Sequence, residues 1–154
     1  MPPLMLKNPQ ALKAMIGSEL GVTEWFQITQ ERVHQFAEAT EDRQWIHVNR
    51  ERASQESPYG TTIAHGFLTL SLIGYFVKEL IEIQGGVGFA VNYGLNRVRF
   101  PAPVPSDSKI RARILLSAWK ELADSIEATF TVTIENDHSE KPSCIAEWIV
   151  RYYA

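Results

Sequence analysis

The chain has 154 residues, of which 45% are hydrophobic and 21% are charged, and its formal net charge at pH 7 is −3. This length suits one domain with its own hydrophobic core, so we expect residues 1–154 to form a single unit. The slightly acidic balance argues against a general nucleic-acid-binding protein, which would usually be basic, but it does not exclude a local basic patch for a phosphate-bearing ligand.

The first third of the chain predicts short elements. Residues 8–17 favour a short helix, and residues 23–28 are a candidate strand. Thr29 is a suitable N-cap for a helix that continues through residues 32–40, where the apolar positions are spaced to face a core. Further along, residues 49–55 indicate one or two helical turns.

A long apolar helix is predicted next, after a turn-rich loop at residues 57–62. It runs from Ile63 to Ile83, and its apolar residues cover nearly every side, which indicates a helix that is wrapped by other structure. Gly85 and Gly86 then end it. The uncharged part of this region is too short and too interrupted to cross a bilayer, so no membrane partner is expected.

Strands fill the second half of the chain. Residues 109–119 and 126–135 alternate between apolar and polar side chains, and residues 87–100 and 144–153 also favour strands. The links between them are short, as in an antiparallel meander. We therefore predict an α+β fold in which an antiparallel sheet wraps around the long central helix.

Two features bear on the cellular compartment. The only cysteine, Cys144, cannot form an intrachain disulfide and is best interpreted as a small buried residue in a strand. The N-terminal residues lack the basic and apolar segments of a signal peptide. Both features lead us to expect a cytoplasmic protein.

The stretch TEDRQWIHVN, residues 40–49, places a carboxylate and an imidazole five residues apart, at Asp42 and His47. On a regular helix this spacing would point them to different faces, so they can converge only on a turn or an irregular loop. Such a pair can move a proton near neutral pH. The residues alone favour a simpler interpretation, in which Asp42 caps a turn and His47 makes a structural hydrogen bond.

A second candidate lies in TIAHGFLTLS, residues 62–71, at the expected start of the long helix. The first N–H groups of a helix lack internal partners, and Gly66 would let a carbonyl oxygen of a ligand approach them as in an oxyanion hole. Ser71 adds a hydroxyl in apolar surroundings, and His65 stands beside Gly66. The alternative is that Ser71 bonds back to its own helix, Gly66 permits tight packing and His65 is a structural hydrogen-bonder.

Basic side chains are frequent in the predicted strands, and they offer a weak signal for a nucleotide-like carrier. A solvated strand face explains them equally well. They are Arg97, Arg99, Lys109, Arg111, Arg113 and Arg151. The four histidines are not at the spacing of metal ligands, and no glycine-rich phosphate-binding pattern is present, so neither kind of site is predicted.

Taken together and in this order, the two candidate stretches resemble the MaoC-like hydratase family, also called R-specific enoyl-CoA hydratases, which has the hot-dog fold. The shared features are DRQWIH at residues 42–47, IAHGF at residues 63–67, and Ser71, which follows the histidine of IAHGF by six residues. The resemblance covers most of residues 16–153 and is most specific in its central third.

The departures from the family pattern bear on substrate choice more than on chemistry. Glu41 stands where the family usually has Gly, Gln44 and Trp45 replace Asn-Pro, and Ser106 replaces the Gly of a later Gly-Asp turn. The QWIH sequence is similar to a subgroup that includes nodulation protein N-like members. Trp45 is either a wall of the acyl tunnel or a packing residue under the loop, and packing is the favoured interpretation.

The resemblance implies a substrate, a site and an assembly. The substrate is a trans-2-enoyl thioester of coenzyme A, which is reversibly hydrated to the (R)-3-hydroxyacyl thioester. Asp42 takes a proton from the water that attacks the β-carbon, and His47 delivers a proton to the α-carbon. Gly66, Ser71 and His65 supply the oxyanion hole and position the substrate. The family needs no metal or redox cofactor, and its members are usually homodimers with their sheets joined edge to edge.

Two other activities stay open at this point. A hot-dog thioesterase also needs a carboxylate and a water, and it releases a free thiol. A non-enzymatic acyl-thioester-binding protein would bind acyl-CoA without turning it over.

Overall fold

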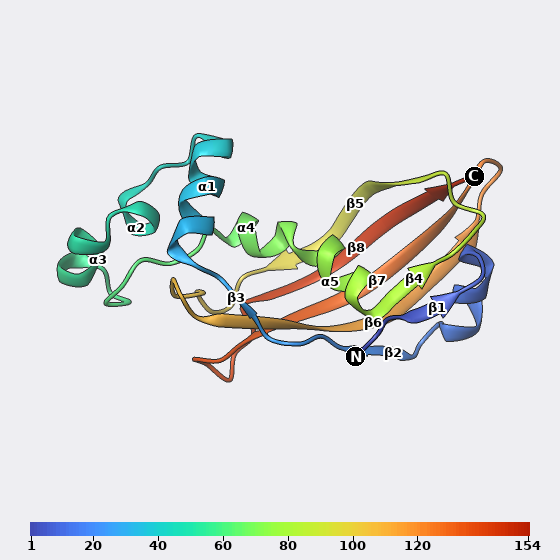
Figure 1. Ribbon diagram of the computed structural model, residues 1–154, viewed down its shortest axis with the longest axis horizontal. Coiled ribbons are helices and arrows are strands. Elements are labelled where there is room, and N and C mark those ends of the chain that lie inside the picture. Colours follow the sequence, from blue (N-terminus) through green and yellow to red (C-terminus); the bar gives the residue numbers. More distant parts are fainter.

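The structure is a computed structural model that describes all of residues 1–154. Long strands form a curved sheet around a helical segment, and further helices from the first part of the chain project from one end (Figure 1). The helices are α1 (Gln30–Thr40), α2 (Trp45–Val48), α3 (Arg50–Glu56), α4 (Gly66–Ser71), α5 (Ile73–Leu80) and the 3-10 helix η1 (Pro9–Met15). The strands are β1 (Leu4–Leu6), β2 (Glu19–Val22), β3 (Phe26–Gln27), β4 (Ile81–Ile83), β5 (Phe89–Arg99), β6 (Lys109–Glu121), β7 (Ser125–Asn136) and β8 (Cys144–Tyr153).

The main sheet is antiparallel and has the strand order β2-β6-β7-β8-β5, with β3 also paired to β6. Strands β6, β7 and β8 follow one another in the chain and pair in sequence, which confirms the predicted meander for these three strands. The meander does not include β5, because this strand pairs with β8 instead of with β6, which follows it in the chain, and forms one edge. A second, two-stranded sheet pairs β1 with β4 in parallel.

The face of the main sheet that turns toward α4 and α5 carries the core. Alternating residues of β6 and β7, among them Ile114, Leu116 and Phe130, have no exposed surface, as the period of a strand requires. Phe76 of α5 is equally buried and belongs to the same cluster. Removing one such side chain from water stabilises the fold by about 1.5–3 kcal/mol, so this layer holds the helical segment against the sheet.

The predicted long helix is shorter than expected, and it is broken. Its first three residues, 63–65, are not helical, because the Ala64 N–H donates to Val104 O (2.8 Å) and ties this segment to the chain after β5. The two helices α4 and α5 then meet at Leu72. The last part of the predicted helix is strand β4 instead, since its backbone pairs with β1.

The elements that lead to the candidate site also differ in part from the prediction. The candidate strand at residues 23–28 is shorter, since only Phe26–Gln27 pair with β6 as β3. The Thr29 side chain accepts from the Arg32 N–H (3.1 Å), which confirms the predicted start of α1. This helix ends where Glu41 takes the left-handed backbone conformation, with a φ of 63°.

None of the helices combines the length and the apolar character that crossing a membrane requires. Cys144 is buried at the start of β8, and burial raises the pKa of its thiol to about 11. The thiol therefore stays protonated at neutral pH, and this cysteine packs as a small core residue.

Candidate active site

The turn after α1 brings Asp42 and His47 to the same place. The left-handed backbone at Glu41 turns the chain, Asp42 follows in an exposed turn, and the short helix α2 carries His47. His47 is buried, with 6% of its surface exposed, whereas Asp42 is exposed. A ligand atom of each side chain lies within 4.8 Å of one on the other. The irregular backbone that the five-residue spacing requires is therefore present.

His65 joins this pair from the second candidate stretch. Its Nε2 donates to the backbone oxygen of Asp42 (2.9 Å). Its ring stacks on the ring of His47, with centroids 3.8 Å apart and planes inclined by 22°. The two stretches therefore form a single site, which is built from the turn after α1, from α2 and from the residue that precedes α4.

The partners of the two imidazoles determine where their hydrogens sit. His47 Nδ1 lies 2.7 Å from Ile63 O, and a carbonyl oxygen only accepts, so Nδ1 carries the hydrogen. In the neutral ring, His47 Nε2 is then a free acceptor. His65 is arranged in the opposite sense, because its Nε2 donates while its Nδ1 is buried without a hydrogen-bond partner.

The surroundings keep the His47 ring neutral. Burial lowers the pKa of this imidazole below its ordinary value of 6.5. Smaller effects act in both directions: the Ile63 carbonyl and the Asp42 carboxylate raise the pKa of His47, and the neighbouring His65 lowers it. At pH 7 the site therefore presents two proton acceptors, which are the Asp42 carboxylate and His47 Nε2.

Asp42, His47 and His65 also form a cluster of possible metal ligands. The spacing of the histidines in the sequence did not predict this cluster, because the fold stacks His47 and His65 from two stretches that are separate in sequence. Each ring uses one nitrogen on a backbone carbonyl, which leaves one nitrogen of each ring for another partner.

A buried polar network beside His47 was not predicted from the sequence. Gln30, the first residue of α1, donates from Nε2 to His47 O (2.7 Å) and accepts from the Thr62 hydroxyl. Thr62 also contacts Ser106 Oγ at 2.7 Å. All three residues are buried, with at most 9% of their surface exposed. The network joins α1, the segment before α4 and the loop before β6 to helix α2, so it determines where His47 lies.

Asp107 holds the same region from the solvent side. Its carboxylate accepts from the Gln30 N–H (3.1 Å) and pairs with Arg50 (2.7 Å). The Arg50 guanidinium holds the pKa of this carboxyl below its ordinary value. These two partners lie 77 and 57 residues away in sequence, so no local pattern could have identified them. In the sequence, this loop was indicated only by Ser106-Asp107, which stands where the family has a Gly-Asp turn.

Gly66 and Ser71 stand at the two ends of α4 and line different cavities. A Cβ added to Gly66 would lie 3.1 Å from the Phe100 ring, so this glycine permits close packing, and its N–H has no acceptor in the protein. Ser71 is exposed, and its hydroxyl donates to Leu68 O (2.7 Å) in its own helix. Gly66 lines a cavity of about 210 Å³, and Ser71 lines another of about 440 Å³.

Structural contacts occupy several of the remaining candidates. Trp45 is half-buried, the Arg52 guanidinium lies 4.2 Å from its ring centroid, and neither cavity beside α4 is lined by it. This position favours packing over an acyl-tunnel wall.

Three of the basic strand residues pair with glutamates, as a solvated strand face predicts. The pairs are Arg111 with Glu135, Arg113 with Glu19 and Arg151 with Glu127.

Comparisons with known proteins show which family and which fold this chain resembles. A family model described as MaoC like domain matches residues 11–138. The chain is 49% identical over 144 residues to 3-hydroxyacyl-thioester dehydratase Z of Mycobacterium tuberculosis, with 93% of this chain and 94% of that protein covered. It is 44% identical over 135 residues to Nodulation protein N of Rhizobium leguminosarum bv. viciae, with 87% and 84% covered. The solved (R)-hydratase from A. caviae involved in PHA biosynthesis shares the fold, with a TM-score of 0.71 at 20% identity over 89% of this chain and 96% of that one.

Proposed function

Because the chain belongs to the MaoC-like dehydratase family, has the hot-dog fold and is a hydro-lyase, we propose that it reversibly adds water to a trans-2-enoyl-CoA and forms the (R)-3-hydroxyacyl-CoA. The observation that carries this proposal is the convergence of the Asp42 carboxylate and the free Nε2 of His47. Two proton acceptors in one small site suit a single activated water. The reverse reaction, dehydration of a 3-hydroxyacyl thioester, agrees with the name of the Mycobacterium tuberculosis relative.

In the proposed reaction, one water donates a hydrogen bond to each acceptor. As its oxygen attacks the β-carbon, a proton leaves the water, with Asp42 as the base, and His47 delivers a proton to the α-carbon. Because His47 Nε2 carries no hydrogen at rest, the proton that Asp42 takes from the water passes to His47 Nε2 before it is delivered to the α-carbon, and Asp42 is left as a carboxylate again. One water is consumed in each turnover. Its hydroxyl group ends on the β-carbon, and its other hydrogen ends on the α-carbon.

His65, Gly66 and Ser71 support this chemistry in different ways. The Gly66 N–H donates to the thioester oxygen, which gains negative charge as the β-carbon is attacked. Ser71 positions the acyl group at the other end of α4. The hydrogen bond from His65 to Asp42 O favours a role in holding the base, in place of the carbonyl contact that the family resemblance implies.

The enzyme is proposed to act as a homodimer that is joined at β5. This edge strand pairs only with β8, and it bears exposed apolar side chains, which are Phe89, Val91, Tyr93 and Leu95. A long apolar edge invites pairing with another strand, and a second copy offers the same strand. Light scattering should give the mass of a dimer, and a monomer at micromolar concentration would contradict this assembly.

The experiment that tests the function is hydration of crotonyl-CoA, followed as the loss of absorbance of the conjugated double bond. Asp42→Asn keeps the shape but removes the base, and His47→Gln removes the proton donor, so each should lower kcat/KM by about 10²–10⁴-fold. Glu51→Gln, an exposed change on α3, is the matched control and should stay active.

Near-normal turnover in both site variants would overturn the assignment of the pair. Product analysis separates the other activities, because release of free coenzyme A would identify a thioesterase. Binding of acyl-CoA without any turnover would identify a non-enzymatic binder.

A further inference from the structure

We propose that Asp42, His47 and His65 bind a divalent transition-metal ion such as Zn²⁺, and that the bound ion inhibits the enzyme by taking the place of the catalytic water. The ion is an inhibitor, so the reaction itself does not use it. The binding half of this inference stands on the three side chains alone. The inhibition half rests on the proposed function, since it assumes that the water is activated between Asp42 and His47.

Three hydrogen-bond acceptors gather at this site. A ligand atom of each of the three side chains lies within 4.8 Å of one on each of the others. Arg43 and Arg50, the arginines nearest to Asp42 in the sequence, pair with other carboxylates. One water can donate to only two of the three acceptors, whereas a cation binds the lone pairs of all three. A cation is therefore the single partner that satisfies the whole cluster.

The unpartnered nitrogen of His65 is an independent observation. This residue is 4% exposed, and its Nδ1 is the only buried side-chain nitrogen or oxygen in the chain without a hydrogen-bond partner. Because Nε2 carries the hydrogen that is donated to Asp42 O, Nδ1 presents a lone pair. A buried polar atom without a partner costs free energy, and a ligand that meets its lone pair recovers that cost.

The other nitrogen of each ring is held as in a metal-binding histidine. Histidine ligands usually donate their second N–H to a backbone carbonyl or a carboxylate, which fixes the tautomer and the ring orientation. His47 Nδ1 donates to Ile63 O (2.7 Å), and His65 Nε2 donates to Asp42 O (2.9 Å). Each ring therefore has the remaining nitrogen available for an ion, which is Nε2 in His47 and Nδ1 in His65.

The ligand set determines the class of ion. Two imidazole nitrogens and one carboxylate suit Zn²⁺ and its neighbours Co²⁺ and Ni²⁺, whereas Mg²⁺ and Ca²⁺ take oxygen ligands. Ligand atoms about 2.0–2.1 Å from a tetrahedral ion lie roughly 3.3 Å apart, so atoms that are within 4.8 Å must approach one another by at most about 1.5 Å.

Two of the three ligands are free to make this adjustment. The rings of His47 and His65 are stacked, with centroids 3.8 Å apart, so one ring has to tilt before both lone pairs reach one ion. The ring of His65 has one hydrogen bond, to the backbone of the exposed turn at Asp42. His47 is held more firmly, because Gln30 binds its backbone oxygen and Ile63 binds its ring. We therefore expect the turn and His65 to close on an ion that is held by His47.

The test is isothermal titration calorimetry with ZnCl₂, which needs no turnover. The wild type should bind one Zn²⁺ per chain. Asp42→Asn changes an exposed residue, and His65→Phe keeps a ring in the stack. Each should weaken this binding by about 100-fold or more, because even a change in the groups that orient metal ligands costs about 10–100-fold. His138→Phe is the matched control: it removes an exposed histidine that lies 3.6 Å from Asp137, and it should leave the affinity of the site unchanged.

The hydration of crotonyl-CoA tests the inhibition half. Zn²⁺ should stop the reaction of the wild type at the concentration that half-saturates the site in calorimetry, and EDTA should restore it. Mg²⁺ at the same concentration should have no effect. Full turnover with Zn²⁺ bound would show that the ion does not take the place of the water, and this half would be overturned.

Two results would overturn the metal site. One is the absence of saturable Zn²⁺ binding to the wild type. The other is equal affinity in the wild type, Asp42→Asn and His65→Phe, because the ion would then bind elsewhere. If His65→Phe does not fold, Asp42→Asn decides the question alone. Failure of the proposed function gives a different pattern, in which the wild type does not hydrate crotonyl-CoA even in EDTA, yet Zn²⁺ binding still depends on Asp42 and His65.

Discussion

Replacing Gln30 by leucine tests whether the network beside His47 supports activity as well as stability. Leucine has nearly the size of glutamine and a good helix propensity, so the change mainly removes two side-chain hydrogen bonds. The backbone oxygen of His47 and the hydroxyl of Thr62 then lose a partner, and both residues are buried.

The expected loss follows from these two groups. A buried polar group without a partner costs about 1–3 kcal/mol, and Thr62 keeps its contact with Ser106, so the free energy of unfolding should decrease by about 2–4 kcal/mol. For a chain of this length that decrease corresponds to a Tm lower by roughly 5–15 °C. Helix α2 would also lose one of its supports, and a displacement of His47 by about 1 Å can lower the rate by about 10²-fold.

Thermal unfolding by circular dichroism and kcat/KM for crotonyl-CoA measure the two effects. Gln35→Leu changes an exposed glutamine on the same helix, and it should alter neither quantity. If Gln30→Leu behaves like Gln35→Leu in both assays, the reasoning about the network is wrong. A lower Tm with normal kcat/KM would limit the network to stability.

The remaining predictions concern the site itself. Burial lowers the pKa of His47 below 6.5, so the unfolded chain takes up a proton at this residue before the folded chain does as the pH falls. The free energy of unfolding, measured with urea, should therefore decrease from about pH 7.5 to about pH 5.5. The decrease should be smaller in His47→Gln. A decrease of equal size in that variant would remove His47 as the cause. Ser71→Ala should lower kcat/KM less than Asp42→Asn does, since the Ser71 hydroxyl already bonds to its own helix, and equal losses would give Ser71 a direct role. Gly66→Val should lower both Tm and kcat/KM, because its side chain would collide with the Phe100 ring, and an unchanged melting curve would show that Phe100 moves aside.

The sheet could be predicted from the sequence more closely than the helices. The alternation over residues 109–119 and 126–135 is a local property, and the observed strands extend these ranges by at most two residues at either end. The apolar run after residue 62 indicated burial, but the helix limits depend on distant partners. Ala64 is held by Val104, and β4 is held by β1, and neither contact has a local signature.

The residues of the candidate site also differ in how far their contacts could be predicted from the sequence. The short stretch that holds Asp42 and His47 favoured a structural interpretation when taken alone, and only the family resemblance, which covers both candidate stretches, implied that they are a functional pair. The contact of His65 with them depends on how the segment before α4 approaches the turn after α1, which no periodicity describes. Gln30 could not be identified at all, since the partners of this one residue lie 17, 32 and 77 positions away.

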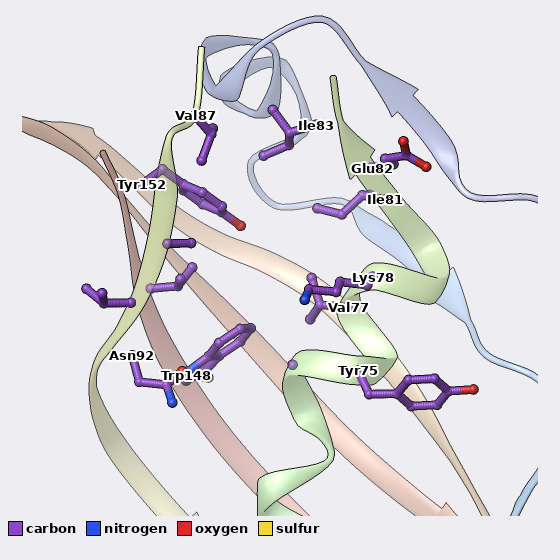
Figure 2. Close-up of a pocket in the computed structure, with 14 residues that line it drawn as sticks. Tyr75, Val77, Lys78, Ile81, Glu82, Ile83, Val87, Asn92, Trp148 and Tyr152 are labelled. Atoms are coloured by element: carbon purple, nitrogen blue, oxygen red, sulfur yellow. The ribbon is translucent and has the colours of Figure 1, made fainter. Parts of the chain in front are cut away.

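The parallel pair of β1 and β4 attaches the N-terminal strand to the wall of a cavity of about 730 Å³, because Ile81 and Ile83 of β4 line that cavity (Figure 2). The pair is three residues long and joins segments that are distant in the chain, so little opposes its separation while the main sheet stays folded. In hydrogen exchange, the Gln84 N–H, which donates to Leu6 O (2.8 Å), should exchange faster than the amides in the centre of β7, and equal protection would show that both open together. Opening of this pair would widen this cavity for a moment, so the dynamics of the N-terminal strand would govern how fast any molecule enters and leaves it.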